Sequence, residues 1–192
     1  MWLGRLQWNT HGRVLGFSQA ALGRPEQPVG SIAIAAVTGK SGFTAFSSSG
    51  GGQLPGFEQG APDQYRIRQF MVETAYHHGG FSWQQEVHWK TIDDRATGRT
   101  IRLLGAYAQA GMFFSEVFDS FPEPLEFAAR LAAVNPDRDR GGAREDEVTL
   151  GANWYFNGHR NKLTLDMSRV ERRLSPENDS SNRVRLQWDL SF

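Results

Sequence analysis

The sequence predicts an all-β protein, an antiparallel transmembrane β-barrel, and three observations lead to this prediction. Stretches in which polar and apolar residues alternate with a period of two recur along the chain, whereas helical periods are scarce. Many of these stretches approach the roughly ten residues that a strand needs to cross a bilayer at a tilt. Aromatic residues gather toward their ends, as in the aromatic girdles of outer-membrane barrels.

A soluble β-sandwich is the alternative architecture, because its strands also alternate. Sandwich strands usually have about five or six residues, which is shorter than the stretches in this chain. An Arg or Lys facing lipid at mid-membrane costs about 2–4 kcal/mol. The cleanest alternations place neither residue on their apolar side. Both observations favour the barrel.

Up to nine strands are expected, in chain order. Five stretches alternate cleanly, and they cover residues 81–90, 125–132, 147–156, 162–168 and 183–192. Three less regular strands are expected at 29–38, 65–78 and 100–114, and a ninth at 2–9. In the last strand, one side is expected to face lipid or a neighbouring subunit and carries Val184, Leu186, Trp188, Leu190 and Phe192. The other side is expected to face the lumen and carries Arg183, Arg185, Gln187 and Asp189.

The connections between these strands differ in length in the way that outer-membrane barrels show, with short turns at one end and longer loops at the other. Short connections are expected at 78–80, 115–124 and 157–161. Longer ones are expected at 39–64, 93–99, 135–145 and 173–182. Residues 9–28 break this rhythm, since they form an unusually long connection on the short-turn side.

Composition excludes several classes of function. The chain of 192 residues is read as a single domain, 1–192, and its 21 basic residues balance its 21 acidic residues, so no nucleic-acid partner is expected. The absence of cysteine excludes disulfides and thiolate chemistry. No stretch reaches the roughly 18 apolar residues of a membrane-spanning helix. Without a nucleophile elbow or a metal-ligand spacing, we expect no enzyme, no catalytic residue, no metal and no cofactor.

Three stretches of the sequence carry a resemblance to a known family: "GFSWQQEVHWK", "TLGANWYFNGHRNKLTLDMSRVE" and the final "RVRLQWDLSF". With these stretches the chain resembles the phosphate-selective porin O/P family, and "LGRLQWN", "GFSQAALGR" and "GSIAIAAVTG" extend the resemblance over nearly all of the sequence. The terminal Phe192 is similar to the signal by which the barrel-assembly machinery recognises outer-membrane barrels.

The resemblance implies an outer-membrane porin of sixteen strands that assembles as a homotrimer and passes small anions, often phosphate or polyphosphate. Outer-membrane lipid, lipopolysaccharide and the barrel-assembly machinery are then the expected partners. The opening "MWLGRLQWNT" lacks a secretory signal, and nine strands is an odd number, so we expect the C-terminal part of a longer porin. A complete eight-stranded barrel is the alternative. For function, the alternative is a non-conducting barrel that serves as an anchor or scaffold.

Selectivity in such a channel comes from the charges that line its lumen. Eight basic residues are placed on polar faces as candidate anion contacts: Arg66, Arg68, Lys90, Arg102, Arg130, Lys162, Arg183 and Arg185. Guanidinium groups suit the geometry of phosphate. The carboxylates expected to oppose them are Glu86, Glu126, Glu147, Asp166 and Asp189. Pairing between strands is the alternative role for all of these charges.

Overall fold

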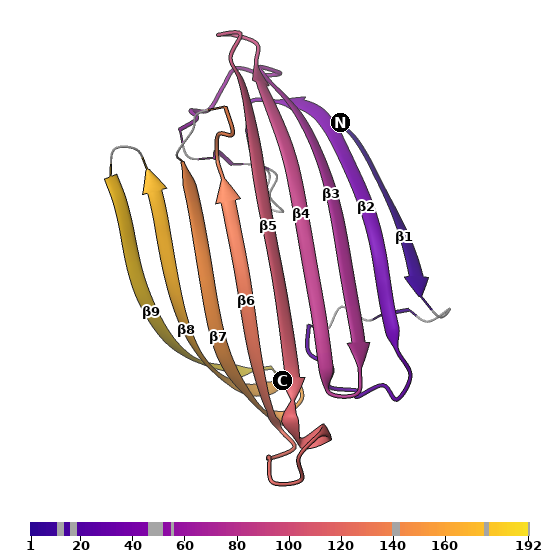
Figure 1. Cartoon of the computed structure of the whole chain (residues 1–192). Coiled ribbons are helices and arrows are strands. Elements are labelled where there is room, and N and C mark those ends of the chain that lie inside the picture. The colour runs from indigo at the N-terminus through magenta and orange to yellow at the C-terminus, as the bar shows by residue number, and fades with distance from the viewer. Residues whose placement is uncertain are drawn as a thin grey trace.

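Nine consecutive β-strands form one antiparallel sheet in which every strand pairs with its neighbours in the sequence (Figure 1). The computed structural model describes residues 1–10, 14–15, 19–45, 52–54, 56–139, 143–174 and 177–191. The strands are β1 (Trp2–Thr10), β2 (Val29–Ser41), β3 (Tyr65–His78), β4 (Phe81–Asp94), β5 (Thr100–Phe113), β6 (Leu125–Asn135), β7 (Arg144–Asn157), β8 (Asn161–Leu174) and β9 (Glu177–Leu190). A 3-10 turn, η1 (Phe114–Glu116), follows β5.

The predicted fold class is confirmed: the sheet is all-antiparallel, and each of the nine expected stretches corresponds to one strand, although β5 and β9 end one and two residues before the expected bounds. Six strands have 14 residues, which is longer than the roughly ten residues that a tilted strand needs to cross a bilayer. Among the described residues, no helix has the length and apolar character needed to cross a membrane.

One connection differs from the prediction. Residues 173–182 were expected to form a long loop, but β8 continues to Leu174 and β9 begins at Glu177. The expectation was wrong because residues 178–182 are all polar and show no alternation, yet their backbone pairs with β8 in unbroken register. The strand ends at Leu190, and Phe192 lies outside the described residues, so its expected lipid-facing position and its role as an assembly signal stay predictions.

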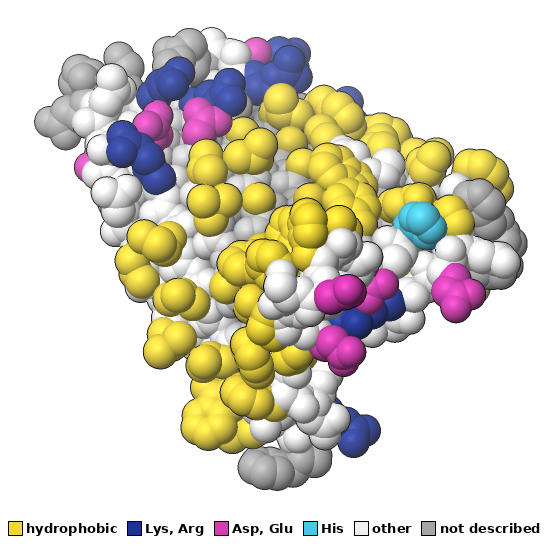
Figure 2. Space-filling model, turned by 60° about the horizontal axis from the view of Figure 1, so that its bottom comes forward, with side chains coloured by type: hydrophobic (Ala, Val, Ile, Leu, Met, Phe, Trp, Pro, Cys, Tyr) yellow, Lys and Arg dark blue, Asp and Glu magenta, His cyan; other side chains and the backbone are white. Residues whose placement is uncertain are grey.

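The pairing register divides the side chains into two faces. One face carries polar side chains, including Gln69, Glu86, Tyr107, Arg130 and Asp166. Residues that pair directly on neighbouring strands, such as Glu86 and Tyr107, project to the same face, and so do residues two positions apart along one strand. The other face exposes large apolar side chains, including Leu6, Ile34, Phe70, Trp89, Leu131, Leu150, Met167 and Leu186. Figure 2 shows such side chains covering a broad band of the visible surface, with charged side chains gathered outside it.

The sheet is curved, and the polar face is its concave side. β6 to β9 curl away from β1 to β5 in Figure 1. Side chains two strands apart meet on the polar face, as Arg5 of β1 meets Glu73 of β3 and Arg183 of β9 meets Glu147 of β7. Such contacts require that alternate strands incline toward each other. We call the two sides the concave face and the convex face.

Two connecting segments fold over the concave face. From the first connection, Ala20 and Leu22 pack against Phe113 and Tyr155 near the short turns. From the connection between β2 and β3, Leu54 and Phe57 pack against a buried cluster of Tyr65, Ile67 and Ile92 at the opposite end. The concave face is therefore partly covered at both ends and open between them.

The two ends of the sheet differ in their connections (Figure 1). At the short-turn end, β3 and β4 are joined by Gly79 and Gly80, and Gly79 has a φ of 53°, which glycine adopts without strain. At the long-loop end, residues 42–64 join β2 to β3, and residues 136–143 join β6 to β7. The predicted long connection at 9–28 lies at the short-turn end.

Candidate pore lining

The middle of the concave face is lined by hydrogen-bonded polar side chains. The Glu86 carboxylate accepts a hydrogen bond from the Tyr107 hydroxyl at 2.6 Å and lies 2.9 Å from His88 Nε2. The amide of Gln109 donates to the side-chain oxygen of Gln84 at 3.2 Å. These groups come from β4 and β5, where directly paired residues project to the same side. This part of the wall is thus polar.

Arg130 of β6 lies beside this network. Its guanidinium carbon is 4.8 Å from the centre of the Tyr107 ring, a cation–π distance. Within the described part of the chain, Arg130 makes no ion pair with a carboxylate. The side chain is exposed, so its N–H donors are accessible from the open part of the concave face.

Strands β7 to β9 carry two arginine–carboxylate pairs. Arg185 directs Nε and Nη2 to the same oxygen of Asp166, each at 2.8 Å. Arg183 reaches the Glu147 carboxylate at 3.2 Å and the Ser168 hydroxyl at 3.3 Å. Arg185 and Asp166 are direct register partners on neighbouring strands, whereas Arg183 reaches Glu147 across the intervening strand β8. Each cation is therefore largely neutralised within the wall.

Glu126 is the most deeply buried carboxylate of the wall, at 3% exposure. It accepts hydrogen bonds from the Asn153 amide at 2.9 Å and the Tyr155 hydroxyl at 2.8 Å. Gly111 on β5 leaves room for it, since a Cβ at that position would lie 2.4 Å from a Glu126 oxygen. This carboxylate belongs to the structure of the wall rather than to its exposed surface.

A hollow of about 250 Å³ on the concave face brings together three of the predicted anion contacts, Arg130, Lys162 and Arg185. Lys162 lies 3.7 Å from the Asp189 carboxylate, a loose ion pair. Arg183 lies two residues before Arg185 on β9, on the same face and nearer the long-loop end. Lys90 is also on the concave face, but its ammonium group donates to the backbone carbonyl of Thr44 and so fastens the covering segment to the wall.

The other three predicted contacts do not join this group. Arg66 and Arg68 alternate along β3 with the concave residues Ile67 and Gln69. Arg102 adjoins the concave Leu103 on β5, so all three arginines lie on the convex face at the long-loop end. Arg68 pairs with Asp93 at 2.9 Å, and Arg102 pairs with Asp139 at 2.9 Å. The alternation in β3 was misassigned because its outermost convex positions are charged rather than apolar. These three residues are left out of the pore lining.

Sequence reasoning missed Arg5, which forms an ion pair with Glu73 on the concave face. The signal was present in "WLGRLQWN", where Arg5 and Gln7 alternate with Leu6 and Trp8. It was overlooked because Leu3 interrupts the pattern. Among the described residues, no group of three or more His, Cys, Asp or Glu side chains could hold a metal ion.

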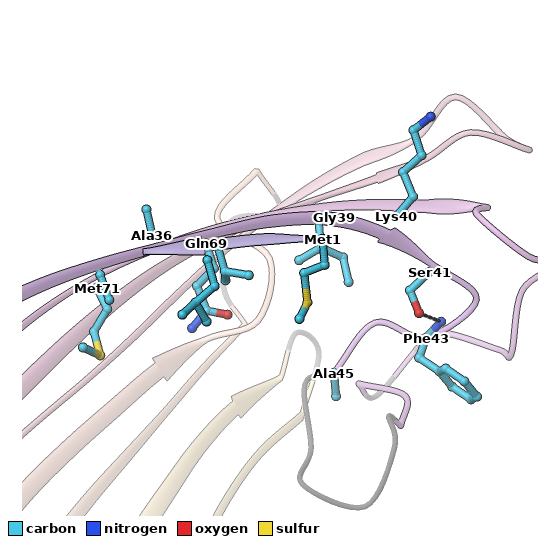
Figure 3. Close-up of a pocket in the computed structure, with 13 residues that line it drawn as sticks. Met1, Ala36, Gly39, Lys40, Ser41, Phe43, Ala45, Gln69 and Met71 are labelled. Atoms are coloured by element: carbon cyan, nitrogen blue, oxygen red, sulfur yellow. Dashed lines mark hydrogen bonds between the residues drawn. The ribbon is translucent and has the colours of Figure 1, made fainter. Parts of the chain in front are cut away.

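Near the long-loop end of β1 to β3 the concave face becomes apolar. A hollow of about 560 Å³ lies there, lined by Met1, Leu3, Val37, Ile67 and Met71 among others. In Figure 3, Met1, Gln69 and Met71 point to one side of the sheet, and Ala36 and Lys40 point to the other. This hollow offers no cluster of charges and is not part of the candidate anion path.

Comparison with known proteins identifies the family to which this chain belongs. The model of the family described as phosphate-selective porin O and P matches residues 57–192, which is more than half of the chain. The chain belongs to the phosphate-selective porin O and P family. No individual curated protein and no solved structure matches it.

Family membership explains the two faces of the sheet. Porins form a channel family rather than an enzyme family, and membership implies a location in the outer membrane of Gram-negative bacteria. The match covers β3 to β9 and so includes the candidate pore lining of Arg130, Lys162, Arg183 and Arg185. The resemblance seen upstream of residue 57 lies outside the matched range.

Proposed function

We propose that this chain forms part of the wall of a water-filled outer-membrane channel that conducts small anions, phosphate among them. The convex face presents apolar side chains to lipid, and the concave face presents the hydrogen-bonded groups to water. The preference for anions rests on one observation: the acidic side chains of the concave face have partners, whereas one of its basic side chains has no acidic partner in the described part of the chain. The described concave carboxylates of the strands' middle have hydrogen-bond or ion-pair partners, whereas Arg130 has no carboxylate partner among the described residues.

The imbalance favours anions for a simple electrostatic reason. A carboxylate whose oxygens already accept hydrogen bonds from arginine, tyrosine or asparagine attracts passing cations weakly. An unpaired guanidinium keeps several donors for a passing anion, and its fork geometry matches two oxygens of a phosphate. Lys162 and Arg185 line the same hollow and add to the positive potential near Arg130.

Ion selectivity in planar lipid bilayers tests this proposal. With a potassium chloride gradient across the bilayer, the reversal potential gives the permeability ratio of chloride to potassium. We expect a ratio above one for the wild-type protein, and a fall of about twofold or more for Arg130→Gln, because a unit charge near a narrow lumen shifts local ion concentrations severalfold. Block of the chloride current by added phosphate measures the preference for phosphate.

Arg102→Gln is the matched control, because it removes the same charge from the convex face, where Arg102 pairs with Asp139. Its permeability ratio should equal that of the wild type. Equal falls in both variants would contradict the role of Arg130. A protein that inserts into bilayers without any conductance would contradict the channel itself.

A non-conducting barrel that serves as an anchor or scaffold is the second candidate function. The observation that favours it is the pair of covering segments, since residues around Ala20 and Leu54 pack over the two ends of the concave face. Assembly as a homotrimer and contact with lipopolysaccharide and the barrel-assembly machinery are proposed with either function. The oligomeric state is measured by light scattering of the purified protein in detergent.

A further inference from the structure

The convex face of β2, β3 and β4 changes from apolar to cationic toward the long-loop end. Three rows of paired residues follow one another in that direction. The first row is Ala36, Phe70 and Trp89, the second is Thr38, Arg68 and Thr91, and the third is Lys40, Arg66 and Asp93. The border of the membrane's hydrocarbon region therefore falls close to the second row, because cations are costly deeper in the membrane.

An open groove of about 590 Å³ crosses the first two rows. Its floor is made of small residues, Gly4, Ala36 and Thr38. Trp2, which is 83% exposed, forms one side. Phe70 and Trp89 form the other side, with their ring centres 5.7 Å apart. An apolar groove between aromatic walls on the lipid-facing side has the shape and chemistry to hold an acyl chain.

Arg68 lies on the groove lining, and Lys40 and Arg66 lie one row farther out. Lys40 points away from the concave face in Figure 3, and its register partner is Arg66. Like charges directly opposite each other on neighbouring strands destabilise a sheet. The nearby carboxylate does not offset this, because Asp93 is already engaged by Arg68 at 2.9 Å and by the Thr100 hydroxyl at 3.0 Å.

Two other convex-face cations at the same end have carboxylates of their own. Arg144 lies 2.7 Å from Asp146, and Arg169 lies 3.0 Å from Glu171. Arg173, opposite Arg144, forms no ion pair among the described residues, but it does not line the groove. Within the described part of the chain, neither Lys40 nor Arg66 forms an ion pair. The cation pair above the groove is thus without a carboxylate partner among the described residues, and its positive potential favours an anion from the surroundings.

We propose that this groove and its two cations form a binding site for a phosphorylated membrane lipid. One acyl chain lies between Trp2 and the Phe70–Trp89 pair, and a headgroup phosphate lies between Lys40 and Arg66. Lipid phosphate fits better than free phosphate, because the cations continue an apolar groove at the membrane surface. The inference rests on the membrane location in the proposed function and is independent of anion conduction.

Binding of lipid A to the purified protein in non-ionic detergent tests the site. Native mass spectrometry measures the fraction of protein that retains diphosphoryl lipid A over a titration. We expect Lys40→Gln combined with Arg66→Gln to weaken this binding about tenfold or more, the effect of losing charge-assisted contacts to one phosphate. Wild-type protein should bind dephosphorylated lipid A as weakly as the double variant binds diphosphoryl lipid A.

The matched control is Arg144→Gln combined with Arg169→Gln, which removes two paired cations from the same face and the same end. This variant should bind lipid A within about twofold of the wild type, since neither cation borders the groove. Equal weakening in both double variants, or equal binding of phosphorylated and dephosphorylated lipid A by the wild type, would overturn the proposal.

A second variant tests the groove without touching the cations. Ala36→Trp fills the groove floor and should weaken lipid A binding, while binding of inorganic phosphate stays unchanged. If inorganic phosphate binds as tightly as lipid A and Ala36→Trp has no effect on either, the cations form a free-phosphate site and the lipid assignment is wrong. If Ala36→Trp disrupts oligomers but leaves lipid A binding intact, the groove is an interface between copies, which also overturns it.

Conductance separates this proposal from the proposed function. Loss of lipid A binding in a variant that still conducts chloride bears on the lipid site alone. Absence of conductance in a wild-type protein that still binds lipid A bears on the channel alone.

Discussion

Asp166 has an unusual position among the charged residues of the concave wall. It is 4% exposed and lies beneath Arg185, which donates to one carboxylate oxygen, Oδ2. The other oxygen, Oδ1, has no hydrogen-bond partner within the described residues. A buried carboxylate with an unsatisfied oxygen is costly, and the two contacts from Arg185 to Oδ2 offset part of that cost. We therefore expect Asp166 to limit how much of the Arg185 charge acts on the proposed lumen.

Replacing Asp166 with Asn tests this control. We expect Asp166→Asn to lower the free energy of unfolding by about 1–3 kcal/mol, because the charge-assisted hydrogen bonds are lost. The same variant should raise the permeability ratio of chloride to potassium, because Arg185 is no longer neutralised. Asp179→Asn is the control, since Asp179 is exposed at the long-loop end and only 4.0 Å from Arg172 at its closest. An unchanged ratio in Asp166→Asn would contradict the role given to Arg185.

Two glycines of β5 provide a matched pair for the packing of the wall. Both Gly105 and Gly111 project toward the concave face. A Cβ at Gly111 would meet a Glu126 oxygen at 2.4 Å and the Ser82 hydroxyl at 2.7 Å, whereas a Cβ at Gly105 would meet nothing within 4 Å. We expect Gly111→Ala to destabilise the protein by about 1–3 kcal/mol through overpacking.

Gly105→Ala should instead stabilise the protein by about 0.5–1 kcal/mol, because alanine restricts the unfolded chain without strain in the strand. Denaturant unfolding in lipid bilayers, followed by tryptophan fluorescence, measures both changes. Destabilisation of similar size in the two variants would mean that the loss of glycine itself, and not contact with Glu126, is the cause.

At the level of the strands, alternation predicted where strands lie better than which way their side chains point. β6, β7 and β8 have one apolar side along their middle, and β4 has one that only Gln85 interrupts, so both the positions and the faces of these strands were predicted. The faces of β3 were not, because its convex positions change from Phe70 to Arg68 and Arg66 near the long-loop end. The start of β9 was missed because a polar strand extension is defined by its pairing with β8 and not by hydrophobicity.

The ion pairs of the candidate site were beyond prediction for a related reason. Glu147 and Arg183 meet across an intervening strand, so their contact depends on the curvature of the sheet as well as on register. Neither property is visible in the alternation of one strand. The sequence therefore indicated which residues are charged and polar-facing, while the partner of each charge required the three-dimensional sheet.

Cysteine scanning of β3 tests its two faces directly, because the natural chain contains no cysteine. Phe70 and Met71 are neighbours in β3 and project to the convex and concave faces. In lipid vesicles, a water-soluble maleimide should label Met71→Cys at least about tenfold faster than Phe70→Cys, because thiolate formation requires water. Thr164→Cys and Leu165→Cys repeat the comparison on β8, where Thr164 lines the concave hollow and Leu165 is exposed on the convex face. Faster labelling at Phe70→Cys would mean that the register of β3 is shifted by one residue.

For the molecule as a whole, the covering segments decide how much of the concave face is open. The segment that contains Ala20 packs against Phe113 and Tyr155 at the short-turn end, and Arg24 in that segment forms an ion pair with Glu116 at 2.9 Å. These contacts hold the segment over the concave face. In this position the segment reduces the open area of the concave face at the short-turn end.

Ala20→Glu is expected to release this segment, because a carboxylate cannot stay buried against Phe113 and Tyr155 without a partner. Single-channel conductance should rise, and the free energy of unfolding should fall by about 1–3 kcal/mol. Gly23→Glu is the control, because Gly23 is exposed and a Cβ there meets nothing within 4 Å. Conductance that rises equally in both variants would point to the added charge and not to movement of the segment.

The strictly consecutive strand order also has a kinetic consequence. Each strand pairs with the one that follows it in the sequence, so the ladder from β3 to β9 grows by closing only short loops, and each closure costs little chain entropy. The connections at 11–28 and 42–64 are longer, so β1 and β2 join at a higher entropic cost. Hairpins near the C-terminus are therefore the natural nucleus for folding, and β1 is expected to dock late.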